Sequence, residues 1–259
     1  MQMKIDYPKI SIITPSYNQG QFITETIDSV LIQNYPNLEY IVMDGGSTDN
    51  TVAVLKSYGT KINWVSRKDN GQTDAINQGI KKSSGEIIAY LNSDDVLLPN
   101  TLHRVAEYFI NNTSALWLTG DYFIIDANGN KIQSFVANYK KILRMFPNKH
   151  TLSIANYIIQ PSTFWRRSLM DEIGFFDEKL HYCMDYDYWM RAIQQYPLHI
   201  LPNYFSLFRI HGDSKGGSLY EKQFIEEHTL VVRYTKNVLI RLLHKIHATL
   251  IVWIYKIIK

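Results

Sequence analysis

The sequence predicts an α/β fold in which a mostly parallel sheet is flanked by helices. Short apolar runs alternate with helix-like segments through the first 110 residues. Apolar strands separated by short helices are typical of a parallel sheet that is covered on both faces. A chain of 259 residues that is 46% hydrophobic and 20% charged is large enough to bury such a core.

The predicted elements follow in a regular order. Strands are expected at residues 10–14, 40–43, 62–65 and 87–91, and helices at residues 24–33, 51–58, 74–82 and 101–110. Beyond residue 110 we expect a hairpin from residues 116–125 and 131–135, a strand at 162–165, a helix at 185–195 and a strand at 204–210. Residues 138–157 are basic and are expected to be irregular.

The tail, residues 237–259, is predicted to form an amphipathic helix. Five polar or basic side chains share one narrow face at 100° per residue: Arg241, Lys245, Thr249, Lys256 and Lys259. Cations spread through the segment argue against a membrane span, whereas Trp253 and Tyr255 suit a helix lying in the headgroup layer. Packing on the domain or on a second subunit is the alternative, and the oligomeric state stays open.

Charge and cysteine content exclude several classes of protein. A net charge of +3 is too small to indicate a nucleic-acid partner. The single cysteine, Cys183, excludes an internal disulfide and a multi-cysteine zinc site. Because residues 1–6 contain no apolar signal run, we expect a cytoplasmic protein.

Polar motifs follow three of the predicted strands. They cover residues 14–18, 44–49 and 92–95. In open α/β sheets ligands bind outside the carboxyl ends of the strands, so these motifs are expected to converge on one site.

The motif Asn92-Ser93-Asp94-Asp95 directly follows a buried strand. Adjacent carboxylates repel one another unless a cation lies between them. A hard divalent ion, Mg²⁺ or Mn²⁺, would relieve that repulsion and could bridge a diphosphate. The alternative is a solvated turn in which an aspartate caps the next helix.

The motif Asp44-Gly45-Gly46-Ser47-Thr48-Asp49 lies between a strand and a helix. Its glycines permit close approach of a ligand to the backbone, and Asp44 could accept hydrogen bonds from a nucleobase or ribose. Ordinary helix capping is the alternative. The motif is neither a phosphate-binding loop with its lysine nor a dinucleotide glycine fingerprint, so kinases and dehydrogenases are disfavoured.

Four stretches together resemble the family 2 glycosyltransferases of the GT-A fold, in the subgroup with an Asp-Gly-Gly-Ser-Thr-Asp motif. They are residues 12–18, 42–49, 69–79 and 85–95, and the resemblance covers residues 8–212. It implies a GT-A domain over residues 1–236, with a nucleotide-binding half at 1–110 and an acceptor-binding half at 111–236. The tail at 237–259 would follow as a membrane-associating helix.

The resemblance also implies roles for individual residues. Asp185 is expected to be the catalytic base, with Asp187 as a rival, and Mn²⁺ or Mg²⁺ is expected on Asp94, Asp95 and His211. The expected contacts to the sugar nucleotide are Thr14, Pro15, Tyr17, Asn18, Asp44, Gly71, Asp74, Asn92, Ser93 and Asp94.

The sequence departs from the family pattern at three positions. A UDP-sugar is favoured as the donor, but Gly45 stands where many relatives have a second acid that is often associated with uracil, so the base is left open. Asn92 replaces the first aspartate of the Asp-x-Asp element, and Met184 replaces the glutamate that usually precedes the base.

We therefore predict an inverting, metal-dependent transferase that moves a sugar from a nucleotide-diphosphate sugar to a hydroxyl of a glycan or lipid-linked acceptor. One carboxylate removes the acceptor proton, and the metal stabilises the departing diphosphate. We expect it on the inner face of a bacterial membrane, in polysaccharide biosynthesis. The alternatives are a nucleotidyltransferase with the same metal site and a non-catalytic module that binds sugar nucleotides.

Overall fold

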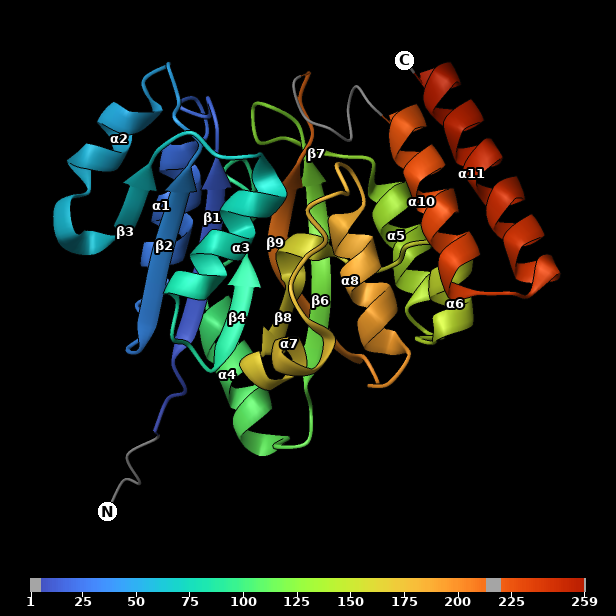
Figure 1. Ribbon diagram of the computed structural model, residues 1–259. Helices are drawn as coiled ribbons and strands as arrows, with labels where there is room; N and C mark the ends of the chain where they lie inside the picture. The colour runs from blue at the N-terminus through green and yellow to red at the C-terminus, as the bar shows by residue number, and fades with distance from the viewer. Residues whose placement is uncertain (1–5, 213–219, 259) are drawn as a thin grey trace.

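A computed structural model describes residues 6–212 and 220–258 (Figure 1). Within these ranges nine strands form one sheet in the order β3-β2-β1-β4-β8-β6-β9-β5, with β7 paired to β6. The predicted α/β class, a mostly parallel sheet flanked by helices, is confirmed. Helix α11 lies at the end of the molecule opposite β3 (Figure 1).

The first half alternates strands and helices as predicted. Its strands are β1 (Ile10–Ser16), β2 (Leu38–Asp44), β3 (Asn63–Ser66) and β4 (Ile87–Tyr90), and its helices are α1 (Ile23–Leu31), α2 (Thr51–Ser57), α3 (Gln72–Lys82) and α4 (Thr101–Asn111). A 3-10 helix, η1 (Gly59–Lys61), precedes β3. Strand β1 pairs in parallel with β2 and β4, and β2 pairs in parallel with β3. The carboxyl ends of these strands therefore meet at one edge.

The second half extends the sheet with strands of both directions. They are β5 (Val96–Leu97), β6 (Trp117–Ile125), β7 (Lys131–Ile132), β8 (Thr163–Arg166) and β9 (His199–Arg209). Strand β8 runs antiparallel to both β4 and β6, β9 runs parallel to β6, and β5 runs antiparallel to β9. The helices are α5 (Ser134–Leu143), α6 (Lys149–Ile154), α7 (Arg167–Ile173), α8 (Met184–Ile193), α10 (Tyr220–Tyr234) and α11 (Val238–Ile258), with a 3-10 helix η2 (Gln160–Ser162) before β8.

Apolar layers cover both faces of the sheet. Alternation along β1 sends Ile12 to the layer formed with α1, α2 and α4, and Ile13 to the layer formed with α3, α7 and α8. Helix α3 approaches β1 closely because Gly79 has no side chain: a Cβ there would come within 2.5 Å of Ile13 Cγ2. The strand ends that carry the polar loops are thus fixed by packing on both sides.

Two expectations for the second half are wrong. Residues 138–157, expected to be irregular, contain most of α5 and all of α6. Helix α6 begins at a cap in which the Asn148 side chain accepts hydrogen bonds from the backbone of His150 and Thr151. The predicted hairpin forms between β6 and β7, but its second strand ends at Ile132 and α5 begins at Ser134.

The tail forms a helix, as predicted, and packs on α6 and α10. His244 is fully buried, and its Nδ1 lies 3.2 Å from the carbonyl oxygen of Ile154. Across residues 6–212 and 220–258, no helix has the length and apolar character needed to cross a bilayer.

Candidate active site

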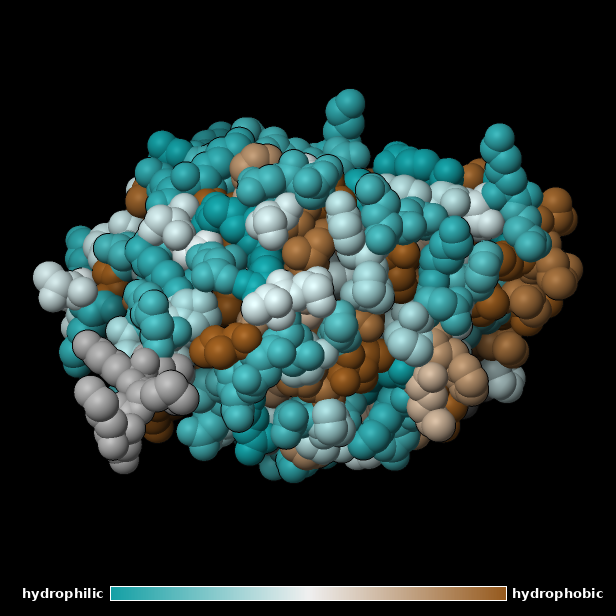
Figure 2. Space-filling view, turned by 90° about the horizontal axis from the view of Figure 1, so that it is seen from below, coloured by the Kyte–Doolittle hydropathy of each residue, from teal (hydrophilic) through white to brown (hydrophobic). Residues whose placement is uncertain are grey.

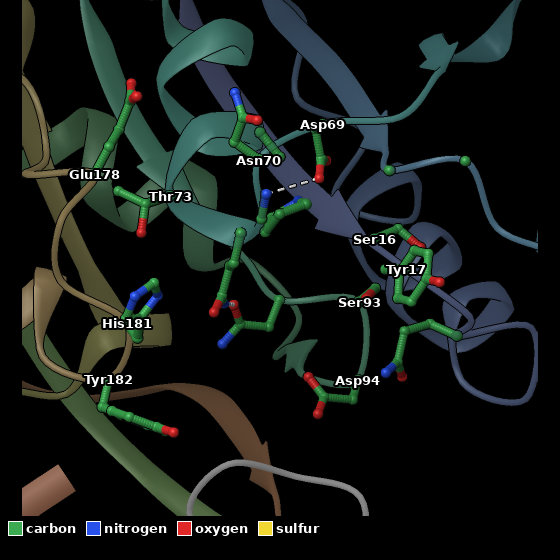
Figure 3. Close-up of a pocket in the computed structure, with 18 of the residues that line it drawn as sticks. Ser16, Tyr17, Asp69, Asn70, Thr73, Ser93, Asp94, Glu178, His181 and Tyr182 are labelled. Atoms are coloured by element: carbon green, nitrogen blue, oxygen red, sulfur yellow. Dashed lines mark hydrogen bonds between the residues drawn. The ribbon is translucent and has the colours of Figure 1, made fainter. Parts of the chain in front are cut away.

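A cleft of about 880 Å³ opens at the carboxyl edge of the parallel strands (Figure 3). Six of the predicted site residues line it: Pro15, Tyr17, Gly71, Asn92, Ser93 and Asp94. Figure 3 shows Tyr17, Ser93 and Asp94 on one side of the cleft and His181 and Tyr182 on the other. The remaining predicted residues do not border it.

The turn after β1 supplies the first part of the wall. Tyr17 is 60% exposed, so its ring is available to a flat ligand. Asn18 has a positive φ of 52°, and its Oδ1 accepts a hydrogen bond of 2.8 Å from the backbone of Thr48. Thr14 is buried in the sheet, with its hydroxyl 3.1 Å from that of Tyr40. Thr14 and Asn18 thus hold the turn, and Tyr17 faces the cleft.

The side chain of Asp44 points into its own loop and not into the cleft. Its carboxylate accepts hydrogen bonds from the backbone of Gly46 (3.2 Å) and Ser47 (3.0 Å) and from the Ser66 hydroxyl (2.6 Å). The residue is 2% exposed. It is the backbone of Gly45 and Gly46 that borders the cleft.

The loop from Asp69 to Asp74 forms the next part of the wall. Asp74 accepts a 3.0 Å hydrogen bond from the backbone of Asn70 and a 2.7 Å bond from Gln78, and these bonds lower the pKa of its carboxyl. Asp74 therefore shapes the loop, while Asp69 borders the cleft. Burial raises the pKa of Asp69, and nearby Asp74 and Asp44 add to the rise. Asp69 lies in a stretch that carries the resemblance, but it was not among the predicted site residues.

The adjacent carboxylates of Asp94 and Asp95 lie in different surroundings. Asp95 is fully buried; it accepts hydrogen bonds from the backbone of Arg209 (2.9 Å) and from the Asn92 amide (3.1 Å). Burial raises its pKa well above the ordinary value, and the charge of Asp94 adds to the rise. Asp94 borders the cleft, and its Oδ2 lies 3.1 Å from His211 Nε2.

Arg209, at the end of β9, holds this loop from behind. Its Nε donates to the carbonyl oxygen of Asp94 at 2.8 Å, and its Nη1 donates to that of Asp126 at 3.1 Å. Its Nη2 pairs with Glu25 at 2.5 Å. The guanidinium side chain is 2% exposed, so these contacts are made out of water. Arg209 was not predicted as a site residue, because nothing in its local sequence reveals contacts with segments so distant along the chain.

The side chains beside the cleft show whether the expected metal ion could be bound there. Among the described residues, no group of three or more His, Cys, Asp or Glu side chains is arranged to hold an ion. Asp94 and His211 offer an oxygen and a nitrogen 3.1 Å apart beside the cleft. Mg²⁺ is commonly bound through one or two carboxylates together with substrate phosphates and water. The pair fits an ion whose shell is completed by a diphosphate, and Asp95 faces away from that position.

The two aspartates at the start of α8 differ in their partners. Asp187 is 2% exposed and pairs with Arg191 at 2.9 Å and with the Tyr234 hydroxyl at 2.6 Å, which ties α8 to α10. Asp185 is half-buried, and its Oδ1 accepts a 2.8 Å hydrogen bond from the backbone of Tyr186. It lies three residues beyond Tyr182, which borders the cleft, but does not itself border it.

A carboxylate from α10 holds the wall opposite Asp94. Glu226 accepts backbone hydrogen bonds from His181 (3.0 Å), Tyr182 (2.7 Å) and Cys183 (2.7 Å). These residues lead directly into α8 and Asp185. Helix α10 was not predicted, so no pattern in the sequence singled out Glu226.

Comparison with known proteins identifies the family. The model of glycosyl transferase family 2 matches residues 11–174. The chain belongs to this family. An uncharacterized glycosyltransferase of Rickettsia prowazekii is 33% identical over 198 residues, which are 74% of this chain and 60% of that protein. The chain thus spans about three fifths of that relative's length. The predicted glycosyltransferase class is confirmed at the level of the family.

Solved structures confirm the GT-A fold. TarS residues 1–349 of S. aureus, in complex with UDP-GlcNAc, aligns with a TM-score of 0.65 at 23% identity, over 86% of this chain and 66% of that one. The mannosyltransferase PcManGT of Pyrobaculum calidifontis, in complex with GDP-Man and Mn²⁺, aligns with a TM-score of 0.70 at 16% identity, over 94% of this chain and 69% of that one.

Proposed function

We propose that the protein transfers a sugar from a nucleotide-diphosphate sugar to an acceptor hydroxyl with inversion at the anomeric carbon. The observation that carries the proposal is the position of Asp94. In a chain of this family, its carboxylate borders a cleft at the carboxyl edge of the sheet and lies beside His211. Such an edge is where ligands bind in α/β folds.

The nucleotide is proposed to bind between the turn after β1 and the loops after β2 and β3. The exposed ring of Tyr17 offers a surface for the base, and the backbone of Gly45 and Gly46 allows close approach of the ribose or phosphates. Complexes of TarS with UDP-GlcNAc and of PcManGT with GDP-Man, which share this fold, support a sugar-nucleotide donor. We favour a UDP-sugar.

Asp94 and His211 are the proposed ligands of Mn²⁺ or Mg²⁺. When bound, the ion supplies Lewis-acid stabilisation of the diphosphate leaving group. PcManGT, with the same fold, was solved with Mn²⁺. Asp95 has a different role, because its buried carboxyl, bonded to the backbone of Arg209, fixes the loop that presents Asp94.

Asp185 is the proposed base. It would accept the proton of the acceptor hydroxyl as that oxygen attacks the anomeric carbon and the bond to the diphosphate breaks. A single displacement of this kind inverts the anomeric centre. Asp187 is less suited because Arg191 and the Tyr234 hydroxyl already occupy its carboxylate.

We also propose the coarser organisation that the sequence implies. Residues 1–110 would bind the nucleotide, residues 111–236 a glycan or lipid-linked acceptor, and residues 237–259 the inner face of the cell membrane. The Asp-Gly-Gly-Ser-Thr-Asp motif at residues 44–49 would define a subgroup of the family.

The test is turnover of UDP- and GDP-sugars with Mn²⁺ or Mg²⁺, before and after Asp185→Asn. Removal of a general base is expected to lower kcat by about 10²- to 10⁴-fold. Donor binding, followed by thermal shift, should persist. Asp171→Asn, at an exposed position on α7, is the matched control and should keep full activity.

Three results would overturn parts of this proposal. Full activity of Asp185→Asn would remove Asp185 as the base. Release of pyrophosphate from a nucleoside triphosphate would indicate a nucleotidyltransferase. Donor binding without turnover by the unmodified chain, over a broad panel of acceptors, would indicate a binding module.

A further inference from the structure

Two helices at one end of the molecule each expose a row of apolar side chains. On α11 the row consists of Leu239, Leu242, Leu243, Ile246, Leu250 and Trp253. On α5 and the turn that follows it, the row consists of Phe135, Tyr139, Ile142, Met145 and Phe146. These side chains are between 37% and 71% exposed, which is unusual for so many large apolar residues in adjoining elements.

The spacing within each row places its members on one helix face. Phe135, Tyr139 and Ile142 are four and three residues apart, so they form a stripe along α5. The α11 row lies opposite His244, which is fully buried against α6. Each helix therefore uses one face for packing and leaves an apolar face outside.

The two rows adjoin. The Tyr139 ring of α5 stacks on the His247 ring of α11, with centroids 5.8 Å apart. Leu243 and Leu250 lie one helical turn before and after His247, so the two rows meet at this contact. We name these side chains together the α5–α11 surface. Figure 2 shows apolar side chains gathered at the right-hand end of the molecule, where Figure 1 places α11.

The segments that carry this surface contain basic residues but no acidic ones. Residues 127–170 and 228–259 contain none of the 24 acidic residues of the chain but 13 of its 27 lysines and arginines. Two of these lysines, Lys149 and Lys245, are exposed beside α5 and on α11, and a third, Lys141, is exposed on α5 and pairs with Asp121 at 3.2 Å. The rest of the chain holds the other 14 cations against all 24 acids.

We propose that the α5–α11 surface docks on an anionic lipid bilayer, with α5 as a second contact beside the tail helix. Exposed apolar rows with cations around them match the acyl boundary and the anionic headgroups of such a membrane. Because residues 127–170 and 228–259 contain no acidic side chains, these segments do not repel the anionic headgroups. The proposal extends the membrane contact proposed for residues 237–259 and does not depend on the transfer reaction.

Docking by two helices has a geometric consequence that one helix would not have. Because α11 packs on α6 and α10, contact through this one helix would let the whole domain rock about the helix axis on the bilayer surface. Contact through α5 as well fixes that rotation, because α5 belongs to the same packed unit as the sheet: Arg144 at its end pairs with Asp121 of β6. Helix α11 ends on the side of the molecule where the β1 and β2 arrows point (Figure 1). The cleft would thus face the bilayer at a defined angle.

The test is vesicle flotation of the full chain with phosphatidylcholine alone and with phosphatidylcholine containing phosphatidylglycerol. We expect binding to the anionic vesicles that weakens as salt is raised. The double variant Phe135→Ser/Ile142→Ser and the double variant Leu242→Ser/Trp253→Ser should each lower the partition coefficient at least about tenfold, given the apolar area removed. Exposed positions are chosen so that folding is preserved.

The matched control is Ile32→Ser/Ile110→Ser, which removes two exposed apolar side chains from α4 and the end of α1. It should bind vesicles as the unmodified chain does. Asp185→Asn should also bind normally, which separates failure of the docking proposal from failure of the proposed reaction.

Distinct outcomes would overturn the proposal. Normal binding by the α5 variant with loss by the α11 variant would leave the tail as the whole contact and remove α5. Failure of the unmodified chain to bind anionic vesicles would exclude a bilayer as the occupant. A dimer in sedimentation that both double variants dissociate, without vesicle binding, would assign the surface to a second copy of this chain.

Discussion

The two walls of the cleft are built in different ways. On the nucleotide side each loop directly follows a parallel strand, and some of its contacts are local, as when the Asp44 carboxylate accepts a hydrogen bond from the backbone of Ser47. On the opposite wall, His181 is held by Glu226, which lies 45 residues further along the chain. The family match, residues 11–174, ends before that wall. The nucleotide side thus takes its position from the ends of the parallel strands, whereas the opposite wall depends on a contact from a distant helix.

Arg209 holds the loop that presents Asp94 through contacts distant in sequence, so its loss should have the largest effect. Arg209→Met removes a buried guanidinium that donates to the carbonyl oxygens of Asp94 and Asp126. Leaving those carbonyl groups unpaired is expected to lower the free energy of unfolding by about 3–5 kcal/mol. Turnover should be lost with it, because the loop that presents Asp94 loses its support. Urea unfolding and initial rates provide the measurement.

Arg104→Met is the control for that prediction. Arg104 is exposed on α4, and a surface change of this kind is expected to stay within about 0.5 kcal/mol. Equal stability of the two variants would show that the buried contacts of Arg209 contribute nothing beyond those of a surface arginine.

The same contrast explains how much the sequence could predict. The strands and helices up to Asn111 were predicted because their apolar periodicity is local, and Tyr17 and Asp94 because they follow predicted strands. Helices α6 and α10 were missed, since α6 is only six residues long and α10 lacks a strong apolar period. The inward turn of Asp95 depends on Arg209, which is distant in sequence and could not be inferred from the motif.

Glu226 tests whether the opposite wall has a specific role. In Glu226→Ala, three backbone amides lose their acceptor, and the segment before Asp185 loses its fixed position. We expect kcat to fall roughly 10- to 100-fold, as misplacement of a reacting group by an ångström does. The KM for the donor should stay within about threefold because the nucleotide side is untouched. Unfolding should require about 1–3 kcal/mol less.

Two companion variants sharpen this prediction. Glu226→Gln keeps an accepting oxygen but turns an NH₂ group toward an N–H donor, so its kcat should lie between those of the unmodified chain and Glu226→Ala. Glu172→Ala, on the exposed side of α7, should behave as the unmodified chain. A rise in donor KM with unchanged kcat would place Glu226 in donor binding and contradict the assignment.

The smallest expected effect concerns Glu227, the buried neighbour of Glu226. Burial raises its pKa from 4.5 to about 7; Lys140 opposes the rise and Asp185 adds to it. Since the folded-state pKa exceeds the unfolded one, the contribution to stability is present below pH 4.5 and is lost as pH rises through 7. Between pH 6 and pH 8 the free energy of unfolding should fall by about 1 kcal/mol more in the unmodified chain than in Glu227→Gln.

Urea unfolding at both pH values measures this difference, with Glu172→Gln, an exposed position, as the control. Parallel pH profiles for the unmodified chain and Glu227→Gln would show that burial in the second half of the chain does not raise the pKa of Glu227.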